Sequence, residues 1–177
     1  TVGDERYTLR VKDLQTGELL PDVVEDTAGD ATWSRDARHL FYLTVDEAWR
    51  PDTVWRHEIG AAGADAKVFH EPDERYWIGI GTTHSEAYLV IGSGSKVTAE
   101  NYVLAADDPT GEFVSVAGRV EGVEYSIEHA RLAGEDYFVL VHNDVRDGVK
   151  AVNFAVDVMP VGRPAERREL IAHDPQR

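Results

Sequence analysis

His39–Leu43 reads HLFYL, and the same pattern returns as AYLVI at Ala87–Ile91 and as DYFVL at Asp136–Leu140. Each run is rich in β-branched and aromatic residues and is bounded by turn-forming residues, which is typical of a β-strand. Aligned on their apolar centres, the copies follow one another after 48 and 49 residues. The sequence therefore repeats a unit built around one apolar strand.

Other strands recur in register with this one. The next strand of each unit begins near Val54, Tyr102 and Phe154, and RYTLRVKDL around Tyr7 matches the Val54 strand one unit earlier. A last strand follows a turn in every unit, as ELL (Glu18–Leu20), KVFHE (Lys67–Glu71), FVSVA (Phe113–Ala117) and RELIAH (Arg168–His173). Helical periodicity is scarce, so these closely spaced strands predict antiparallel meanders rather than βαβ units.

A unit of this length that holds four strands is the signature of a propeller blade. We therefore predict an all-β fold of antiparallel four-stranded meander blades, a partial β-propeller of about three and a half blades. One domain would span residues 1–177, with units at about residues 1–28, 29–74, 75–120 and 121–177. Complete propellers have roughly 4 to 8 blades, so two open edges are expected, and the chain is expected to be a piece of a longer protein.

The composition narrows the classes of partner. Of the 177 residues, 18 are Lys or Arg and 33 are Asp or Glu, which gives a net charge of -15. Such a surface repels nucleic acid and anionic membranes; it suits a basic ligand, although acidic surfaces also simply keep proteins soluble. The chain has no cysteine, which fits a cytoplasmic location, and no apolar run approaches the ~18 residues of a membrane span. We expect neither a nucleic acid nor a membrane partner.

The only compact serine, aspartate and histidine trio is Ser34, Asp36 and His39, in the stretch WSRDARHLF. This stretch is predicted to be strand, turn and strand, in which Ser34 and Asp36 bond turn amides. A hydrolytic triad instead brings its members together from separate parts of a fold. No serine lies in a G-x-S-x-G motif either. We therefore predict no catalytic residue in this chain.

Motifs for metals and cofactors are also missing. The seven histidines show no H-x-x-x-H or H-E-x-x-H spacing, and GIGTTH and GSGSK lack the spacing of phosphate-binding loops. Neither a metal nor a cofactor is predicted. The tryptophans are expected to pack within blades rather than to form a sugar platform, and they are Trp33, Trp49, Trp55 and Trp77.

Four longer stretches resemble a known family. They are ERYTLRVKDLQTGELLPD (Glu5–Asp22), DTVWRHEIG (Asp52–Gly60), IGSGSKVTAENYVLAADDPTGEF (Ile91–Phe113) and GVEYSIEHA (Gly122–Ala130). Together they resemble the N-terminal propeller domain of the prolyl oligopeptidase family of serine peptidases, in particular its oligopeptidase B (protease II) branch. The resemblance spans nearly the whole chain and is looser after Val149.

The resemblance implies a closed propeller that covers an α/β-hydrolase domain. It implies cleavage of short peptides, in this branch after Lys or Arg, with a Ser-Asp-His triad in the hydrolase domain. No position here matches the motifs of that domain, so the catalytic domain is expected to be absent from this sequence. What carries over is the role of the propeller, which restricts the active site to small peptides.

The innermost strand of the third full unit is predicted to be VEYSIEHA. Its alternation places Glu124, Ser126 and Glu128 on one face and His129 on the other. Acidic side chains near the path of a peptide would favour basic substrates, so Glu124, Glu128 and His129 are the substrate-channel candidates. The alternative for Glu128 and His129 is a hydrogen-bonded structural pair.

Two other functions stay open from the sequence. The chain could be a non-catalytic, propeller-like protein-interaction module, or two copies could close one ring through their open edges as a homodimer. The predicted partners are accordingly short basic peptides, the missing hydrolase domain and remaining blades, or a second copy.

Overall fold

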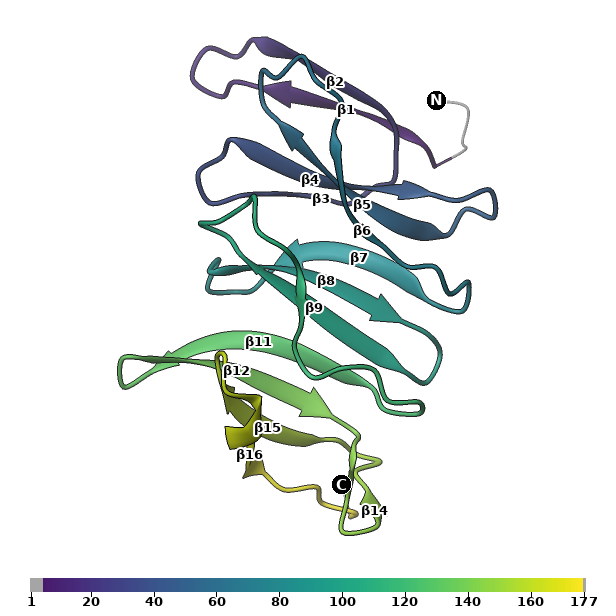
Figure 1. Cartoon of the computed structure of the whole chain (residues 1–177), viewed down its shortest axis with the longest axis vertical. Helices are drawn as coiled ribbons and strands as arrows, with labels where there is room; N and C mark the ends of the chain where they lie inside the picture. Colours follow the sequence, from purple (N-terminus) through teal and green to yellow (C-terminus); the bar gives the residue numbers. More distant parts are fainter. Residues whose placement is uncertain (1–4, 177) are drawn as a thin grey trace.

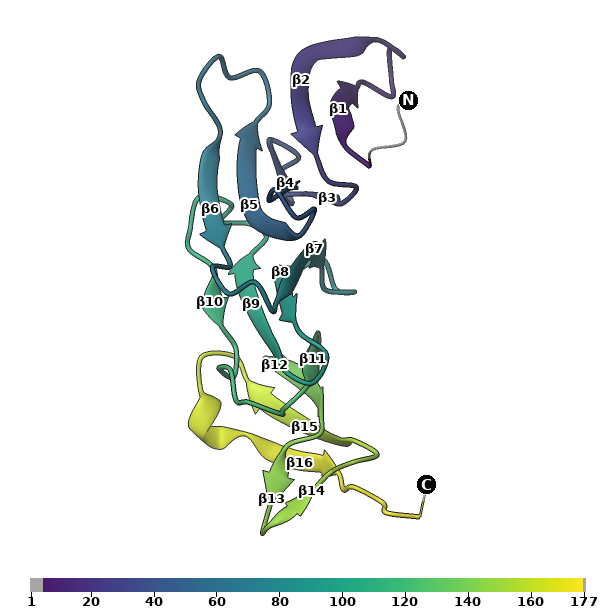
Figure 2. The same ribbon diagram turned by 90° about the vertical axis from the view of Figure 1, so that its right-hand side faces the viewer.

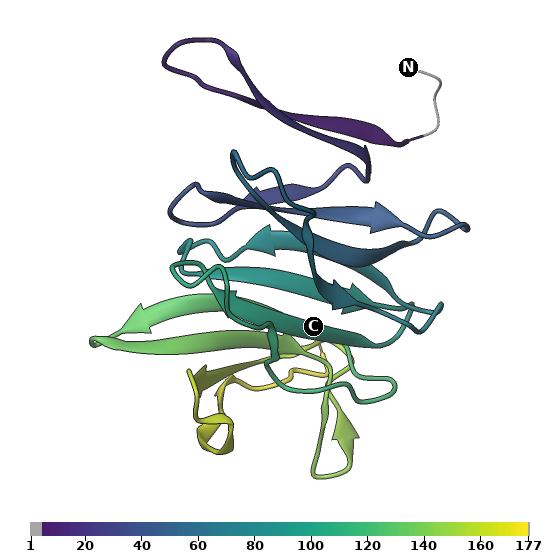
Figure 3. The ribbon, with the colours of Figure 1, turned by 45° about the horizontal axis from the view of Figure 1, so that its top comes forward.

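The computed structural model describes residues 5–176. Its strands form three four-stranded antiparallel sheets after a first, two-stranded sheet. The sheets stack on one another in chain order, as Figures 1 and 3 show. Within residues 5–176 the one helical element is a short 3-10 turn, η1 (Pro164–Glu166), and no helix could cross a membrane. The predicted fold of antiparallel blades, three complete and one partial, is confirmed.

Each sheet is a meander of neighbouring strands. The first sheet contains β1 (Tyr7–Lys12) and β2 (Leu19–Thr27). The second contains β3 (Ala31–Trp33), β4 (His39–Val45), β5 (Pro51–Glu58) and β6 (Ala66–His70). Those of the third are β7 (Trp77–Thr82), β8 (Tyr88–Gly94), β9 (Ala99–Ala105) and β10 (Val114–Ser115). The fourth contains β11 (Tyr125–Leu132), β12 (Glu135–His142), β15 (Ala155–Pro160) and β16 (Arg168–Ile171).

The fourth sheet departs from the sequence expectation at one place. A small hairpin of β13 (Val145–Arg146) and β14 (Val149–Lys150) is inserted between β12 and β15. This insertion lengthens the connection between β12 and β15. The strand expected to begin near Phe154 starts at Ala155, because Phe154 is a turn residue with a φ of 61°.

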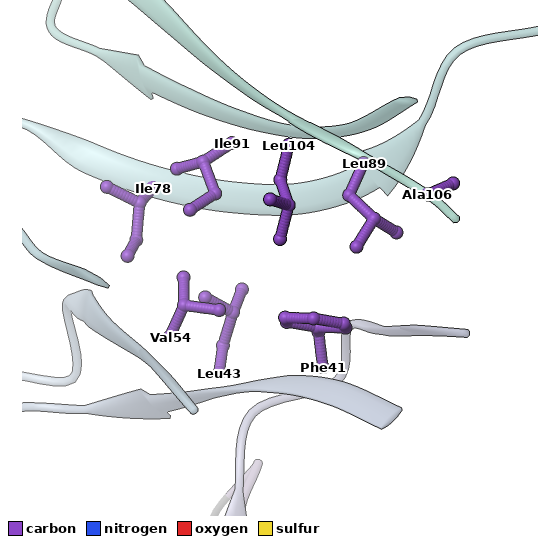
Figure 4. Close-up of a cluster of buried hydrophobic side chains, with 8 residues drawn as sticks. All are labelled: Phe41, Leu43, Val54, Ile78, Leu89, Ile91, Leu104 and Ala106. Carbon is purple, nitrogen blue, oxygen red and sulfur yellow. The ribbon is translucent and has the colours of Figure 1, made fainter. Parts of the chain in front are cut away.

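The sheets are joined by apolar side chains that alternate along their central strands. Between the second and third sheets, the cluster consists of Phe41, Leu43, Val54, Ile78, Leu89, Ile91, Leu104 and Ala106 (Figure 4). Between the third and fourth sheets it consists of Val103, Val116, Tyr125, Ile127, Phe138, Leu140 and Met159. We call these contacts the second and third junctions, and the contact of the first and second sheets the first junction.

The Ser34, Asp36 and His39 trio forms the turn that leads into β4. Ser34 Oγ donates to Asp36 Oδ1 at 2.5 Å and accepts from the backbone N–H of His39 at 3.0 Å. Asp36 Oδ1 also accepts from the N–H of Arg38 at 3.0 Å. The serine hydroxyl is therefore committed to the turn, and the His39 imidazole lies 3.8 Å from Asp36 Oδ1. The predicted structural role is confirmed.

The packing role predicted for the tryptophans is wrong for three of them. Trp33, Trp49 and Trp77 are 42%, 42% and 57% exposed. Trp33 and Trp77 lie on β3 and β7, which are edge strands and so have no neighbouring strand on one side. Trp55, by contrast, is half-buried and donates Nε1–H to Thr44 Oγ1 at 2.9 Å.

The first junction is polar. His57 on β5 lies between two carboxylates, with Nε2 3.0 Å from Asp22 Oδ1 on β2 and Nδ1 2.8 Å from Asp65 Oδ1. The N–H of Gly60 donates to Asp22, which lowers the pKa of that carboxyl. Burial lowers the pKa of His57, but hydrogen bonds to Asp65 and Asp22 outweigh burial, so this pKa is raised.

We expect this junction to weaken as the pH rises. Because the pKa of His57 is raised on folding, its contribution is fully present below its unfolded value of about 6.5 and is lost as the pH passes through the higher folded value. The free energy of unfolding should therefore fall more steeply above pH ~6.5 in the wild type than in His57→Gln. Urea titrations between about pH 5.5 and 8.5 measure this; parallel profiles for the two proteins would contradict it.

Candidate functional site

The inner edge of the stack is formed by β3, β7 and β11. Each of them is the edge strand of its sheet, and β6, β10 and β16 form the opposite edges. Figure 2 shows β3, β7 and β11 on one side of the stack, and the stack bows so that this side is concave. VEYSIEHA thus contains an edge strand, as predicted for an innermost strand.

The structure places Glu124 at the start of β11, away from the other two candidates. Its N–H donates to Asn143 Oδ1 at 2.7 Å, and its carboxylate accepts from Asn143 Nδ2 at 3.1 Å. Asn143 follows β12 and is buried. Glu124 is thereby held in a fixed position, half-exposed, beside the neutral amide of Asn143.

Glu128 and His129 both reach back to the turn between β7 and β8. Glu128 is exposed, and its Oε2 accepts from the N–H of His84 at 2.9 Å. His129 Nδ1 lies 2.8 Å from Ser85 Oγ, and its ring lies 5.1 Å from that of Tyr88. The His129 side chain is only 6% exposed, so it is far less accessible to a peptide than Glu128.

A second group of carboxylates lies at one end of β7. A cleft of about 510 Å³ is lined there by Asp46, Glu47, Ala48, Arg50, Glu74 and Trp77. Glu47 and Glu74 are exposed, and within residues 5–176 neither has a basic partner. Asp46 instead pairs with the buried Arg50 at 2.9 Å. The cleft therefore combines two uncompensated negative charges with the exposed indole of Trp77, a surface suited to an ammonium or guanidinium group.

The segment between the second and third sheets is fixed by buried charges. Arg50 Nη1 donates to the carbonyl oxygens of Glu71 and Tyr76, both at 3.0 Å. Arg119 donates to the Glu71 carboxylate and, through Nε, to Glu100 at 3.0 Å. Its guanidinium lies 3.8 Å from the centre of the Tyr76 ring. These contacts hold the Glu71–Trp77 segment, and with it one wall of the acidic cleft.

Sequence reasoning missed this cleft. One signal was present, because two acidic residues precede an aromatic residue in both DEAWR (Asp46–Arg50) and DERYW (Asp73–Trp77). The two phrases lie far apart in the sequence, and only the stacking of the second and third sheets brings them together. Within residues 5–176, no group of three or more acidic or histidine side chains is arranged to hold a metal ion.

Comparisons with known proteins agree with this architecture. The family described as "Prolyl oligopeptidase, N-terminal beta-propeller domain" matches residues 1–177. Protease 2 of Moraxella lacunata is 32% identical over 99% of this chain, and dipeptidyl aminopeptidase BI of Pseudoxanthomonas mexicana is 33% identical over 98%. The chain spans only 24% and 23% of these two relatives.

Solved structures show the same likeness. Oligopeptidase B from Leishmania major superposes with a TM-score of 0.82 at 29% identity, over 96% of this chain and 23% of that one. Oligopeptidase B from Trypanosoma brucei, in a closed form with covalently bound antipain, gives 0.80 at 29% identity, over 98% and 23%. The chain belongs to the N-terminal β-propeller domain of the prolyl oligopeptidase family.

Proposed function

We propose that this propeller segment forms part of the path by which short basic peptides reach the active site of a serine oligopeptidase. The hydrolase domain with its triad would be supplied by another part of the parent protein. The observation that carries the proposal is the set of uncompensated carboxylates at one end of β7 and on β11. Glu47 and Glu74 line the cleft beside Trp77, and Glu128 is exposed on β11.

The physical basis is electrostatic attraction inside a narrow space. Negatively charged carboxylates that line a cleft raise the local concentration of a peptide with Lys or Arg side chains. The ammonium or guanidinium groups of such a peptide are also attracted to an indole face. Glu124 and Glu128 would extend this potential along β11. The relatives, which include a protease and an oligopeptidase, support a peptide as the substrate.

The test uses the full-length parent enzyme. Glu47→Gln/Glu74→Gln should raise KM for an Arg-Arg peptide by about twofold to thirtyfold, since each of the two exposed charges contributes roughly 0.2–1 kcal/mol. The kcat value and the KM for a neutral peptide should stay unchanged, because the residues attract the substrate and take no part in the chemistry. Glu166→Gln, an exposed carboxylate in η1, is the control. An unchanged KM for the Arg-Arg peptide would contradict the role of the cleft.

A second candidate function is a protein-interaction module that pairs with a copy of itself. The fourth sheet presents an apolar surface, with Val141, Leu170 and Ile171 40%, 56% and 59% exposed. Such a surface is covered in a complete assembly, either by further blades or by a second chain. Light scattering of the 177-residue chain distinguishes the two, because a dimer mass supports self-pairing and a monomer at high concentration excludes it.

A further inference from the structure

The second and third junctions repeat one strand register, so their residues can be matched one to one. Ser34 N donates to His39 O at 2.9 Å, and Thr83 N donates to Tyr88 O at 2.9 Å, so the turns before β4 and β8 are equivalent. Two residues beyond each turn, Phe41 pairs with Arg56, and the equivalent residue of β8 pairs with Val103. Val103 therefore occupies in the third sheet the position that Arg56 has in the second.

A guanidinium and an aromatic ring together fill the second junction at this position. Arg56 Nη1 donates to the carbonyl oxygen of Pro109 at 2.9 Å, in the loop between β9 and β10. Phe113 packs edge-on against Phe41, with ring centroids 6.0 Å apart and an interplanar angle of 86°. One basic and one aromatic side chain thus pack across the second junction at this position, beside its apolar cluster.

Both groups are missing from the third junction. Val103 is too short to cross it, as Arg56 does at the second. The equivalent of Phe113 is Arg167, because each directly precedes a residue that pairs with the third strand of its sheet. Arg167 donates Nε–H to the carboxylate of Asp157 at 2.6 Å, and the Asp157 side chain is fully buried. An ion pair has replaced the aromatic contact and leaves the space beside it unfilled.

A cavity of about 400 Å³ lies in the third junction, beside Val103. In Figure 2, β10 and the turn after β15 lie on the same side of the stack, and residues of both line the cavity. The apolar lining includes Tyr88, Val103, Val116, Phe138, Met159 and Val161. Asp108 and Glu112 also line it, and Glu112 is exposed without a basic partner within residues 5–176.

We propose that this cavity binds a small arylalkylamine. The aromatic ring lies against the wall of Val103, Phe138 and Met159. The ammonium group pairs with Glu112 or Asp108, which line the same cavity. A cavity of about 150 Å³ lined by apolar side chains already accepts benzene, so this space is sufficient for a ring with an ethylamine chain.

The single methionine gives a direct test. Met159 is the only methionine of the sequence, so a chain labelled with methyl-¹³C methionine gives one methyl resonance, and this methyl group lies in the wall of the cavity. Titration with phenethylamine should shift this resonance along a saturable curve. Ethylbenzene, which lacks the charge, should bind about twofold to fivefold more weakly. No shift of the resonance at tens of millimolar phenethylamine would overturn the proposal.

Variants locate the ligand. Val161→Phe fills the cavity and should abolish the shift, whereas Val141→Phe, on an exposed position of β12 outside the cavity, should leave it unchanged. Glu112→Gln should weaken phenethylamine about twofold to fivefold and leave ethylbenzene unaffected, and this surface change gives a result even where Val161→Phe does not fold. A folded Val161→Phe chain that responds like the wild type would place the ligand elsewhere and overturn the proposal.

Discussion

Arg119→Met is expected to lower the free energy of unfolding by about 3–5 kcal/mol, as measured by urea denaturation. The side chain of Glu71 is only 3% exposed, and Arg119 is the only basic group that pairs with its carboxylate among residues 5–176. Without Arg119, this carboxylate keeps only the Ser93 hydroxyl and the N–H of Asp73 as donors. A buried charge without a counter-ion is among the most costly defects that one substitution creates.

The matched control is Arg75→Met, four residues after Glu71. Arg75 also pairs with a carboxylate, that of Asp73 at 2.7 Å, but its side chain is 66% exposed. Water solvates both charges there, so this substitution should lower the free energy of unfolding by less than about 1 kcal/mol. Equal effects of the two substitutions would show that the buried pair is no stronger than the surface pair.

The same pair gives the stability a defined pH dependence. Burial raises the pKa of Glu71, but hydrogen bonds from Arg119 and Ser93 outweigh burial, and the pKa is lowered on folding. Its contribution is therefore present above the unfolded value of about 4.3 and is lost as the pH falls through the lower folded value. The acid sensitivity below pH ~4.3 should be reduced in Arg119→Met, where the cause of the lowered pKa is gone.

Phe41→Ala is expected to cost about 3–5 kcal/mol of unfolding free energy. Phe41 is fully buried in the second junction, where it faces the third sheet and packs edge-on against Phe113 (Figure 4). Truncation removes the contacts that the ring makes with both sheets and leaves a cavity between them. Neighbouring side chains on rigid strands cannot close this cavity.

Phe154→Ala is the control for this substitution. Phe154 is 39% exposed and lies in the turn before β15, so its truncation opens no enclosed space. This truncation should lower the free energy of unfolding by no more than about 1 kcal/mol. A Phe41→Ala chain as stable as this control would mean that the second and third sheets are not held together by the apolar cluster.

The repeated apolar strand was sufficient to predict the stacking of sheets, because a continuous apolar run such as that of β4 reports burial on both faces of a strand. HLFYL and DYFVL could be identified as β4 and β12 for this reason. The edge strands were less predictable, since their exposure depends on neighbours that are distant in sequence. Trp33 and Trp77 have ordinary strand sequences around them, and only the sheet order leaves them exposed.

The candidate site was predictable in part. Glu128 and His129 lie on an edge strand as expected, but the contact of His129 with Ser85 arises from a turn 44 residues earlier in the sequence. Glu47 and Glu74 come together through the fixed segment that Arg50 and Arg119 anchor. No local pattern encodes such a meeting, because it depends on how two sheets are stacked.

The most direct test of the proposed path is the ionic-strength dependence of kcat/KM in the full-length parent enzyme, for an Arg-Arg peptide relative to a neutral peptide. Attraction by exposed carboxylates is screened as the Debye length falls from about 10 Å at 0.1 M to about 3 Å at 1 M salt. The ratio should therefore fall with added salt in the wild type and change less when Glu47, Glu74, Glu124 and Glu128 are all replaced by Gln. The same salt dependence in both enzymes would contradict a role of this concave edge in selecting basic peptides.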